Sequence, residues 1–146
     1  MKILIDADGC PVVDIAVKIA NNADVECIII CDTSHVFEKK GAKTITVSQG
    51  SDSVDFVLVN MAKAGDIVVT QDYGLAAMCL AKRCVPLNQD GMIYSDENID
   101  ALLMSRHNAR KIRNAGGRLK GSPKRSSQQN EAFGKSLKNL LQEEIK

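Results

Sequence analysis

Short, continuously apolar segments that end in polar or acidic turns constrain most strongly what this 146-residue chain can fold into. Residues 3–5 and 67–69 contain only Ile, Leu and Val, without the alternation of apolar and polar side chains that marks a half-exposed strand. Strands of this kind are covered on both faces, as in a parallel sheet flanked by helices. Strands are therefore predicted over residues 3–5, 25–31, 44–47, 67–70 and 85–87.

Apolar residues at helical spacing fill most of the intervals between these strands. Helices are predicted over residues 12–20, 52–64, 73–83, 95–115 and 128–145, the last opened by a capping box of Ser126 and Gln129. Gly65 is expected to cap the second helix, and residues 91–94 to form a short hairpin arm. This order predicts a three-layer α/β fold with a parallel sheet, right-handed crossovers and a C-terminal helical extension. The length suits one domain spanning residues 1–146.

Composition indicates a cytoplasmic protein. The chain has five cysteines, at positions 10, 27, 31, 79 and 84, and two histidines, and no two cysteines form a C-x-x-C pair. Buried, reduced thiols are therefore expected rather than a structural zinc site. The amino terminus lacks the apolar core of a signal peptide, and no apolar run reaches transmembrane length. No membrane partner is expected.

Aspartates gather where the predicted strands end. Asp6 and Asp8 follow the first strand, Asp72 closes the fourth, and Asp52 and Asp55 open the helix that precedes the fourth. Ligands of open parallel sheets bind beyond the carboxyl ends of the strands, so these carboxylates are expected to converge. Such a cluster repels itself unless it is protonated or holds a hard cation, and oxygen-only ligation suits Mg²⁺ or Mn²⁺. The five aspartates are thus predicted metal ligands.

Each of these aspartates also has a purely structural interpretation, because Asp is common at helix starts and turns. Asp72 and Asp52 would then cap the helices that follow them, and Asp8 would belong to a plain turn. The metal interpretation is favoured because all five acids would otherwise have to reach the same end of the sheet independently. Asp66 lies at the opposite end of its strand and is interpreted as a turn residue.

A basic segment follows an acidic body. Residues 1–105 hold 8 Lys and Arg against 15 Asp and Glu, whereas residues 106–125 hold 8 basic residues and no acidic one. Electrostatic contact with a nucleic-acid backbone is predicted, since no aromatic residues are interleaved to stack on bases. The alternative is a solvated face that complements the acidic body. The predicted nucleic-acid contacts are Arg106, Arg110, Arg113, Arg118, Lys120, Lys124 and Arg125.

The sequence resembles the YaiI/YqxD family of bacterial proteins, which is itself similar to the PIN-like nuclease superfamily. The segments that carry the resemblance are DADGCPV at 6–12, GSDSVD at 50–55, GDIVVTQD at 65–72, LAA at 75–77 and GSP at 121–123. Two positions depart from the family pattern, which usually has Ala at Gly9 and often has Pro at Gly74. The resemblance covers nearly the whole chain and implies a single PIN-like, Rossmann-like domain with a basic loop at 116–127.

The superfamily pattern falls on Asp6, Asp55, Thr70 and Asp72, with Asp8 and Asp52 as supplementary metal ligands. By resemblance these residues imply metal-assisted hydrolysis of phosphodiester bonds, with Mg²⁺ or Mn²⁺ as cofactor and RNA favoured over DNA as partner. Family membership alone does not carry catalysis, because sites change while folds persist.

Two other functions remain open at this stage. One is a non-catalytic nucleic-acid-binding or regulatory module that keeps the metal site only to stabilise the fold. The other, less favoured, is a haloacid-dehalogenase-like phosphatase, because Asp6-Ala7-Asp8-Gly9 after an apolar strand resembles the nucleophile motif of that class. That class also requires an acidic pair at a later strand end, which this sequence lacks.

Overall fold

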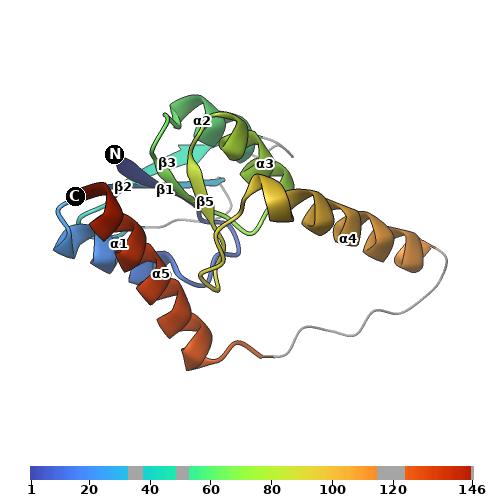
Figure 1. The fold of residues 1–146 in the computed structure, drawn as a ribbon. Helices are drawn as coiled ribbons and strands as arrows, with labels where there is room; N and C mark the ends of the chain where they lie inside the picture. Colours follow the sequence, from blue (N-terminus) through green and yellow to red (C-terminus); the bar gives the residue numbers. More distant parts are fainter. Residues whose placement is uncertain (33–37, 49–52, 115–123, 146) are drawn as a thin grey trace.

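The fold is built on a sheet of five parallel strands in the order β3-β2-β1-β4-β5 (Figure 1). The computed structural model describes residues 1–32, 38–48, 53–114 and 124–145. All five predicted strands are present within these residues, so the parallel α/β prediction is confirmed. The strands are β1 (Lys2–Asp6), β2 (Glu26–Asp32), β3 (Lys43–Val47), β4 (Ile67–Val69) and β5 (Val85–Leu87).

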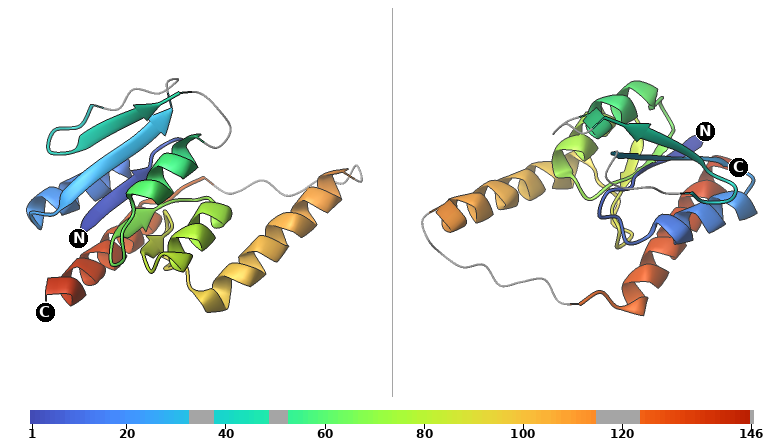
Figure 2. Two further views of the ribbon diagram at one scale, coloured as in Figure 1. Left: turned by 90° about the horizontal axis from the view of Figure 1, so that it is seen from above. Right: turned by 180° about the vertical axis from the view of Figure 1, so that it is seen from behind.

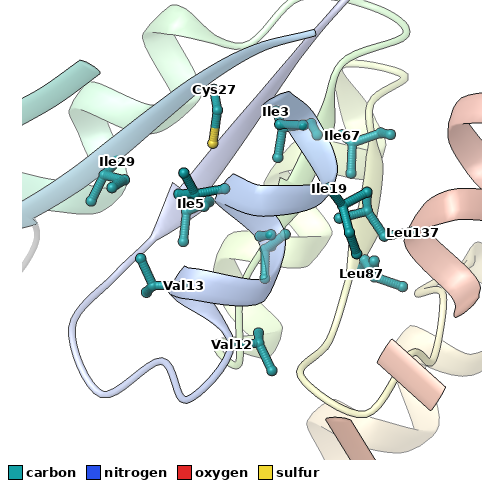
Figure 3. Packing of buried hydrophobic residues seen from close by; sticks show 14 of the residues in the cluster. Ile3, Ile5, Val12, Val13, Ile19, Cys27, Ile29, Ile67, Leu87 and Leu137 are labelled. Atoms are coloured by element: carbon teal, nitrogen blue, oxygen red, sulfur yellow. The ribbon is translucent and has the colours of Figure 1, made fainter. Parts of the chain in front are cut away.

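Helices cover both faces of the sheet and make the fold three-layered. Successive strand residues point to opposite faces, so Ile3 and Ile5 of β1 join one buried cluster and Leu4 joins another. The first cluster packs against α1 (Val13–Asn22) and α5 (Ser127–Ile145), as Figure 3 shows for Ile19 and Leu137. The second packs against α2 (Ser53–Met61) and α3 (Tyr73–Ala81). Burial on both faces explains why the strand sequences do not alternate.

The starts of the last two helices are fixed by reciprocal side-chain caps. The predicted box of Ser126 and Gln129 is confirmed: the Gln129 side chain accepts from the Ser126 backbone N–H at 2.7 Å, and Ser126 Oγ accepts in return. A second box was not anticipated. Ser95 and Asn98 exchange the same pair of bonds at 3.0 and 3.2 Å at the start of α4 (Asp96–Asn114). Both caps satisfy backbone donors that a helix start leaves unpaired.

Two local predictions were wrong. The second helix ends at Met61 rather than 64, because the chain turns at 63–66, where the Asp66 backbone N–H donates to the Lys63 carbonyl. Gly65 therefore occupies this turn, with φ of 89°, instead of capping the helix. The expected short hairpin arm at 91–94 is confirmed: it consists of one antiparallel bridge between Leu87 and Ile93.

The last two helices differ in how they meet the body. α5 lies along α1, while the first half of α4 packs against α3 and its second half projects away from the body in every view (Figures 1 and 2). Arg125 ties the start of α5 to the segment after β5 through an ion pair with Asp90 at 2.7 Å. Among the residues that the structure describes, no helix has the length and apolarity needed to span a membrane.

Candidate functional site

The candidate site lies at the carboxyl ends of β1 and β4, which are adjacent in the sheet. Asp6 is the last residue of β1, and Thr70 directly follows β4. The two strands pair in register from Ile3 opposite Ile67 to Ile5 opposite Val69. Asp6 and Thr70 are consequently the next pair along, and the local sequence delivers both side chains to the same edge.

A short chain of hydrogen bonds fixes the centre of the site. The Thr70 hydroxyl donates to Asp6 Oδ2 at 2.8 Å and accepts from the Asp72 backbone N–H at 3.0 Å. The buried Tyr94 hydroxyl donates to the Thr70 carbonyl at 3.1 Å. Thr70 is 1% exposed, so it has little access to water and acts by holding Asp6 and the start of α3 in place.

The Asp6 carboxyl is electrostatically strained. The pKa of this carboxyl is raised from its ordinary 3.8 to about 6, and burial is the largest cause. The hydrogen bond from Thr70 opposes the rise, and the negative charges of Asp55, Asp72 and Asp8 contribute to it, in that order. Asp6, Asp8 and Asp72 all stand at or just after strand ends at this edge of the sheet, and Asp55 is near enough for its charge to act on Asp6.

Asp55 and Asp8 reach the site from different segments. Asp55 stands in the first turn of α2 and is the strongest of the three charges acting on Asp6. Asp8 follows β1, and its Oδ2 accepts from the backbone N–H of Asp32 at the end of β2, at 3.2 Å. Asp8 thereby also joins the ends of two strands. Asp52, the fifth predicted ligand, lies outside the described residues.

An open pocket of about 360 Å³ lies over this cluster, lined by Asp6, Asp8, Gln71, Asp72 and Tyr73. Sequence reasoning missed Gln71 and Tyr73. Gln71 donates from its side-chain amide to the Gly9 carbonyl at 2.8 Å, which ties the β4 end to the β1 loop. In the sequence, only their position beside Thr70 and Asp72 indicated that Gln71 and Tyr73 belong to the site. A larger groove of about 610 Å³ between α1 and α5 contains none of these residues. We place the site at the smaller pocket, because the clustered carboxylates line it.

Asp72 combines two of the roles considered from sequence. Its Oδ1 accepts from the backbone N–H groups of Gly74 and Leu75, at 2.8 and 3.3 Å, so Asp72 caps α3. The interpretation of Asp72 as a helix cap is therefore correct. The same side chain lines the pocket and acts on Asp6, so the capping role leaves a role in the site open.

Asp66 lies at the other end of the sheet, as its place before β4 predicted. Its carboxylate accepts from the Lys2 ammonium at 2.6 Å, from the Lys2 backbone N–H at 3.1 Å and from the Lys63 backbone N–H at 2.9 Å. Burial alone would raise the pKa of this carboxyl, but these bonds and the Lys2 charge outweigh burial and lower it. Asp66 is thus a buried structural anchor as well as a turn residue.

The carboxylate side chains at the candidate site have the donor atoms that a hard divalent cation prefers, but these side chains stand apart from one another. All the candidate ligands are carboxylates, the oxygen donors that Mg²⁺ and Mn²⁺ prefer. Within residues 1–32, 38–48, 53–114 and 124–145, no three His, Cys, Asp or Glu side chains stand close enough to hold an ion together. Mg²⁺ keeps several waters and needs only one or two direct carboxylates. The residues therefore fit an ion held directly by one or two aspartates and through water by the others.

The predicted basic contacts are distributed unevenly. Arg110, Lys111 and Lys124 are exposed, whereas the Arg125 guanidinium binds Asp90, the Asn130 side chain and the Gln89 carbonyl. Arg125 therefore already serves to dock α5. Arg118 and Lys120 lie outside the described residues, as do most of the predicted loop at 116–127 and the side chains of Arg106 and Arg113.

Comparison with known proteins finds relatives along the whole chain. The family described as an uncharacterized bacterial group, YaiI/YqxD, matches residues 4–143. A UPF0178 protein of Exiguobacterium sibiricum is 51% identical over 143 residues, covering 98% of both chains. Another of Ruminiclostridium cellulolyticum is 54% identical over 137 residues, covering 94% of this chain and 90% of the relative. No solved structure matches.

Proposed function

The chain belongs to the YaiI/YqxD family, and we propose that it is a divalent-metal-dependent nuclease that hydrolyses phosphodiester bonds in RNA. The observation that carries the proposal is Asp6, a largely buried carboxyl whose pKa is raised to about 6 beside three other aspartates in an open pocket. A carboxyl whose pKa is raised by burial and by neighbouring carboxylates is typical of catalytic sites, and a cation relieves the repulsion.

In this proposal Asp6, Asp8, Asp55 and Asp72 would hold the ion, directly or through water, and Asp52 would add to the negative charge. A bound divalent cation supplies activation of water and offsets the charge that develops on the phosphate in transit. Thr70 is a positioning residue: its hydroxyl holds Asp6 Oδ2 at 2.8 Å and so fixes the direction in which the other carboxylate oxygen points. The proposal requires the open pocket over these residues to admit a polymer backbone.

The basic segment 106–125 is the proposed contact with the nucleic-acid backbone. Its exposed members Arg110, Lys111 and Lys124 supply charge without base recognition. A cytoplasmic location, where RNA is abundant, is part of the proposal. All five cysteines are free thiols, which suits a reducing compartment.

The test compares single-stranded RNA, single-stranded DNA and a small phosphate ester, each with and without millimolar Mg²⁺ or Mn²⁺. We expect metal-dependent cleavage of RNA, lost in Asp6→Asn and weakened in Thr70→Val. The matched control is Asp24→Asn: Asp24 is exposed, precedes β2 at the opposite end of the sheet and has φ of 56°, which Asn accepts. This control should cleave like the native protein.

Other outcomes assign the alternatives. RNA binding without cleavage under any metal condition would favour the non-catalytic module. Hydrolysis of the small ester alone would favour the phosphatase. Affinity for RNA should fall steeply as salt rises, since each neutralised phosphate releases counterions, and salt-independent binding would reject the basic segment as the contact.

A further inference from the structure

Helix α4 carries an apolar face that no other described element covers. Its members recur at spacings of three and one, which places them on one side of the helix. Met104 is 59% exposed and Ile112 is 45% exposed, and apolar side chains that gather on one exposed face can mark an interaction site. The α4 face consists of Ala101, Met104, Ser105, Asn108, Ala109 and Ile112, which together line a shallow surface groove of about 500 Å³.

The α4 face is separate from the contact that α4 makes with the body. Ile99, Leu102 and Leu103 hold the helix against α3 and belong to the cluster around Tyr94. These residues lie on the other side of the helix from the α4 face. Because the second half of α4 also projects from the body (Figures 1 and 2), a second chain has room to approach the α4 face.

Charge is divided along α4 and indicates which partner fits. Its first turns carry exposed Asp96, Glu97 and Asp100, and its last turns carry exposed Arg110 and Lys111. Asp100 and Lys111 are about three helical turns apart and so lie along the same edge of the α4 face. A second α4 running in the opposite direction places the acidic end of each helix beside the basic end of the other. A parallel partner would instead bring like charges together.

We propose that two copies of this chain associate through their α4 faces, with the two helices antiparallel. One register places Ala101 opposite Ile112 of the second copy on the centre line of the face, so a small side chain meets a large one. The same register places Ser105 opposite Asn108 of the second copy, and such a polar pair fixes alignment. Asp100 of each copy then lies beside Lys111 of the other. The two bodies lie at opposite ends of the helix pair.

The association is weak and reversible, because the contact spans only about 17 Å of helix. It does not depend on the proposed nuclease activity and uses no residue of the aspartate site, although Lys111 is also one of the proposed nucleic-acid contacts. The native chain should sediment as a monomer of 15.8 kDa when dilute and approach twice that mass as the concentration rises towards about 1 mM. A single monomer mass over this whole range would overturn the proposal.

Charge reversal tests the antiparallel arrangement. Lys111→Glu and Asp100→Lys should each weaken dimerisation by roughly tenfold, because each places like charges together twice in the symmetric pair. The double variant Asp100→Lys with Lys111→Glu should regain native dimerisation. Within one chain these two positions are about 17 Å apart, so recovery cannot come from a bond inside a single helix. Double-variant dimerisation no stronger than that of the single variants would reject this pairing.

Met104→Asp tests the apolar part of the face and should abolish the dimer. Its matched control is Met78→Asp, since Met78 is a 42% exposed methionine on the neighbouring α3 and lies outside the α4 face. Circular dichroism should show native helix content in both variants, because both side chains are exposed. Equal loss of dimer in the two variants would contradict the assigned face.

Discussion

Asp6 is the residue at which stability and the proposed chemistry oppose each other. Burial and three neighbouring carboxylates favour its protonated form, and the Thr70 hydroxyl favours its charged form. The balance leaves a folded-state pKa of about 6, above the ordinary 3.8. A cation site is expected to lower the stability of the fold when the ion is absent. The reason is that the carboxylates that would bind the ion repel one another without it.

The cost at Asp6 predicts a specific pH dependence of stability. The native state holds the Asp6 proton more tightly than the unfolded chain, so this contribution is fully present below pH 3.8 and is lost as pH rises to about 6. The loss amounts to roughly 3 kcal/mol in the metal-free protein. Urea unfolding from pH 4 to 7 should show the free energy of the native protein falling relative to that of Asp6→Asn. A constant difference between the two across this range would contradict the raised pKa.

Asp66 should behave in the opposite way. Asp66→Ala leaves the Lys2 ammonium and two backbone N–H groups without their carboxylate, so we expect a loss of about 3 kcal/mol in free energy of unfolding. Because the pKa of Asp66 is lowered, its contribution is present above 3.8 and is lost as pH falls below that value. Denaturant unfolding at pH 7 and pH 3 measures both effects. RNA cleavage per folded molecule should be unchanged, because Asp66 is at the other end of the sheet.

At the scale of single elements, the start of α3 joins architecture to the site. Asp72 caps the helix through Oδ1 and also lines the pocket, so one residue sets both where α3 begins and the charge beside Asp6. A plain loss-of-function variant at Asp72 would confuse the two roles. The difference between Asn and Ala at this position separates them, since Asn caps about as well as Asp.

We expect Asp72→Asn to leave α3 intact and Asp72→Ala to cost about 1 kcal/mol of stability. Both variants remove the carboxylate and should reduce metal binding and cleavage to a similar extent. Thermal unfolding and isothermal titration with Mn²⁺ provide the two measurements. Native metal affinity in Asp72→Asn would show that Asp72 is a cap only.

For the whole molecule, cation binding should be linked to folding. An ion that binds only the folded state adds about 2.7 kcal/mol when it is present at roughly one hundred times its dissociation constant. Millimolar Mg²⁺ or Mn²⁺ should therefore raise the melting temperature of the native protein. Asp6→Asn should melt at or above the temperature of the metal-free native protein and gain little from either ion, because repulsion and ligation are removed together.

Simple salt provides the control for this shift, since general screening acts on every surface charge alike. Sodium chloride at matched ionic strength should shift the melting temperatures of the native protein and of Asp6→Asn by the same small amount. A melting curve of the native protein that responds to neither Mg²⁺ nor Mn²⁺ would reject the metal site and leave helix capping as the role of Asp72.

The sequence alone determined the strands, their parallel arrangement and the end of the sheet at which the acids gather. The reason is local: doubly covered strands must be continuously apolar, and the residue that follows such a strand is necessarily at its carboxyl end. The capping box at Ser126 was equally local, because its bonds join residues three positions apart. These features needed no knowledge of distant contacts.

Only the tertiary structure decided how the acids are used and how the last helices lie. Nothing local to Asp66 announces its ion pair with Lys2, because the two residues are 64 positions apart. Arg125 and Asp90 are 35 positions apart in the sequence. Their contact holds the Arg125 side chain against the body, whereas the basic residues around it had predicted a nucleic-acid contact. The exposure of Met104 likewise depends on where α4 leaves the body, which is set by packing of distant segments rather than by helical spacing.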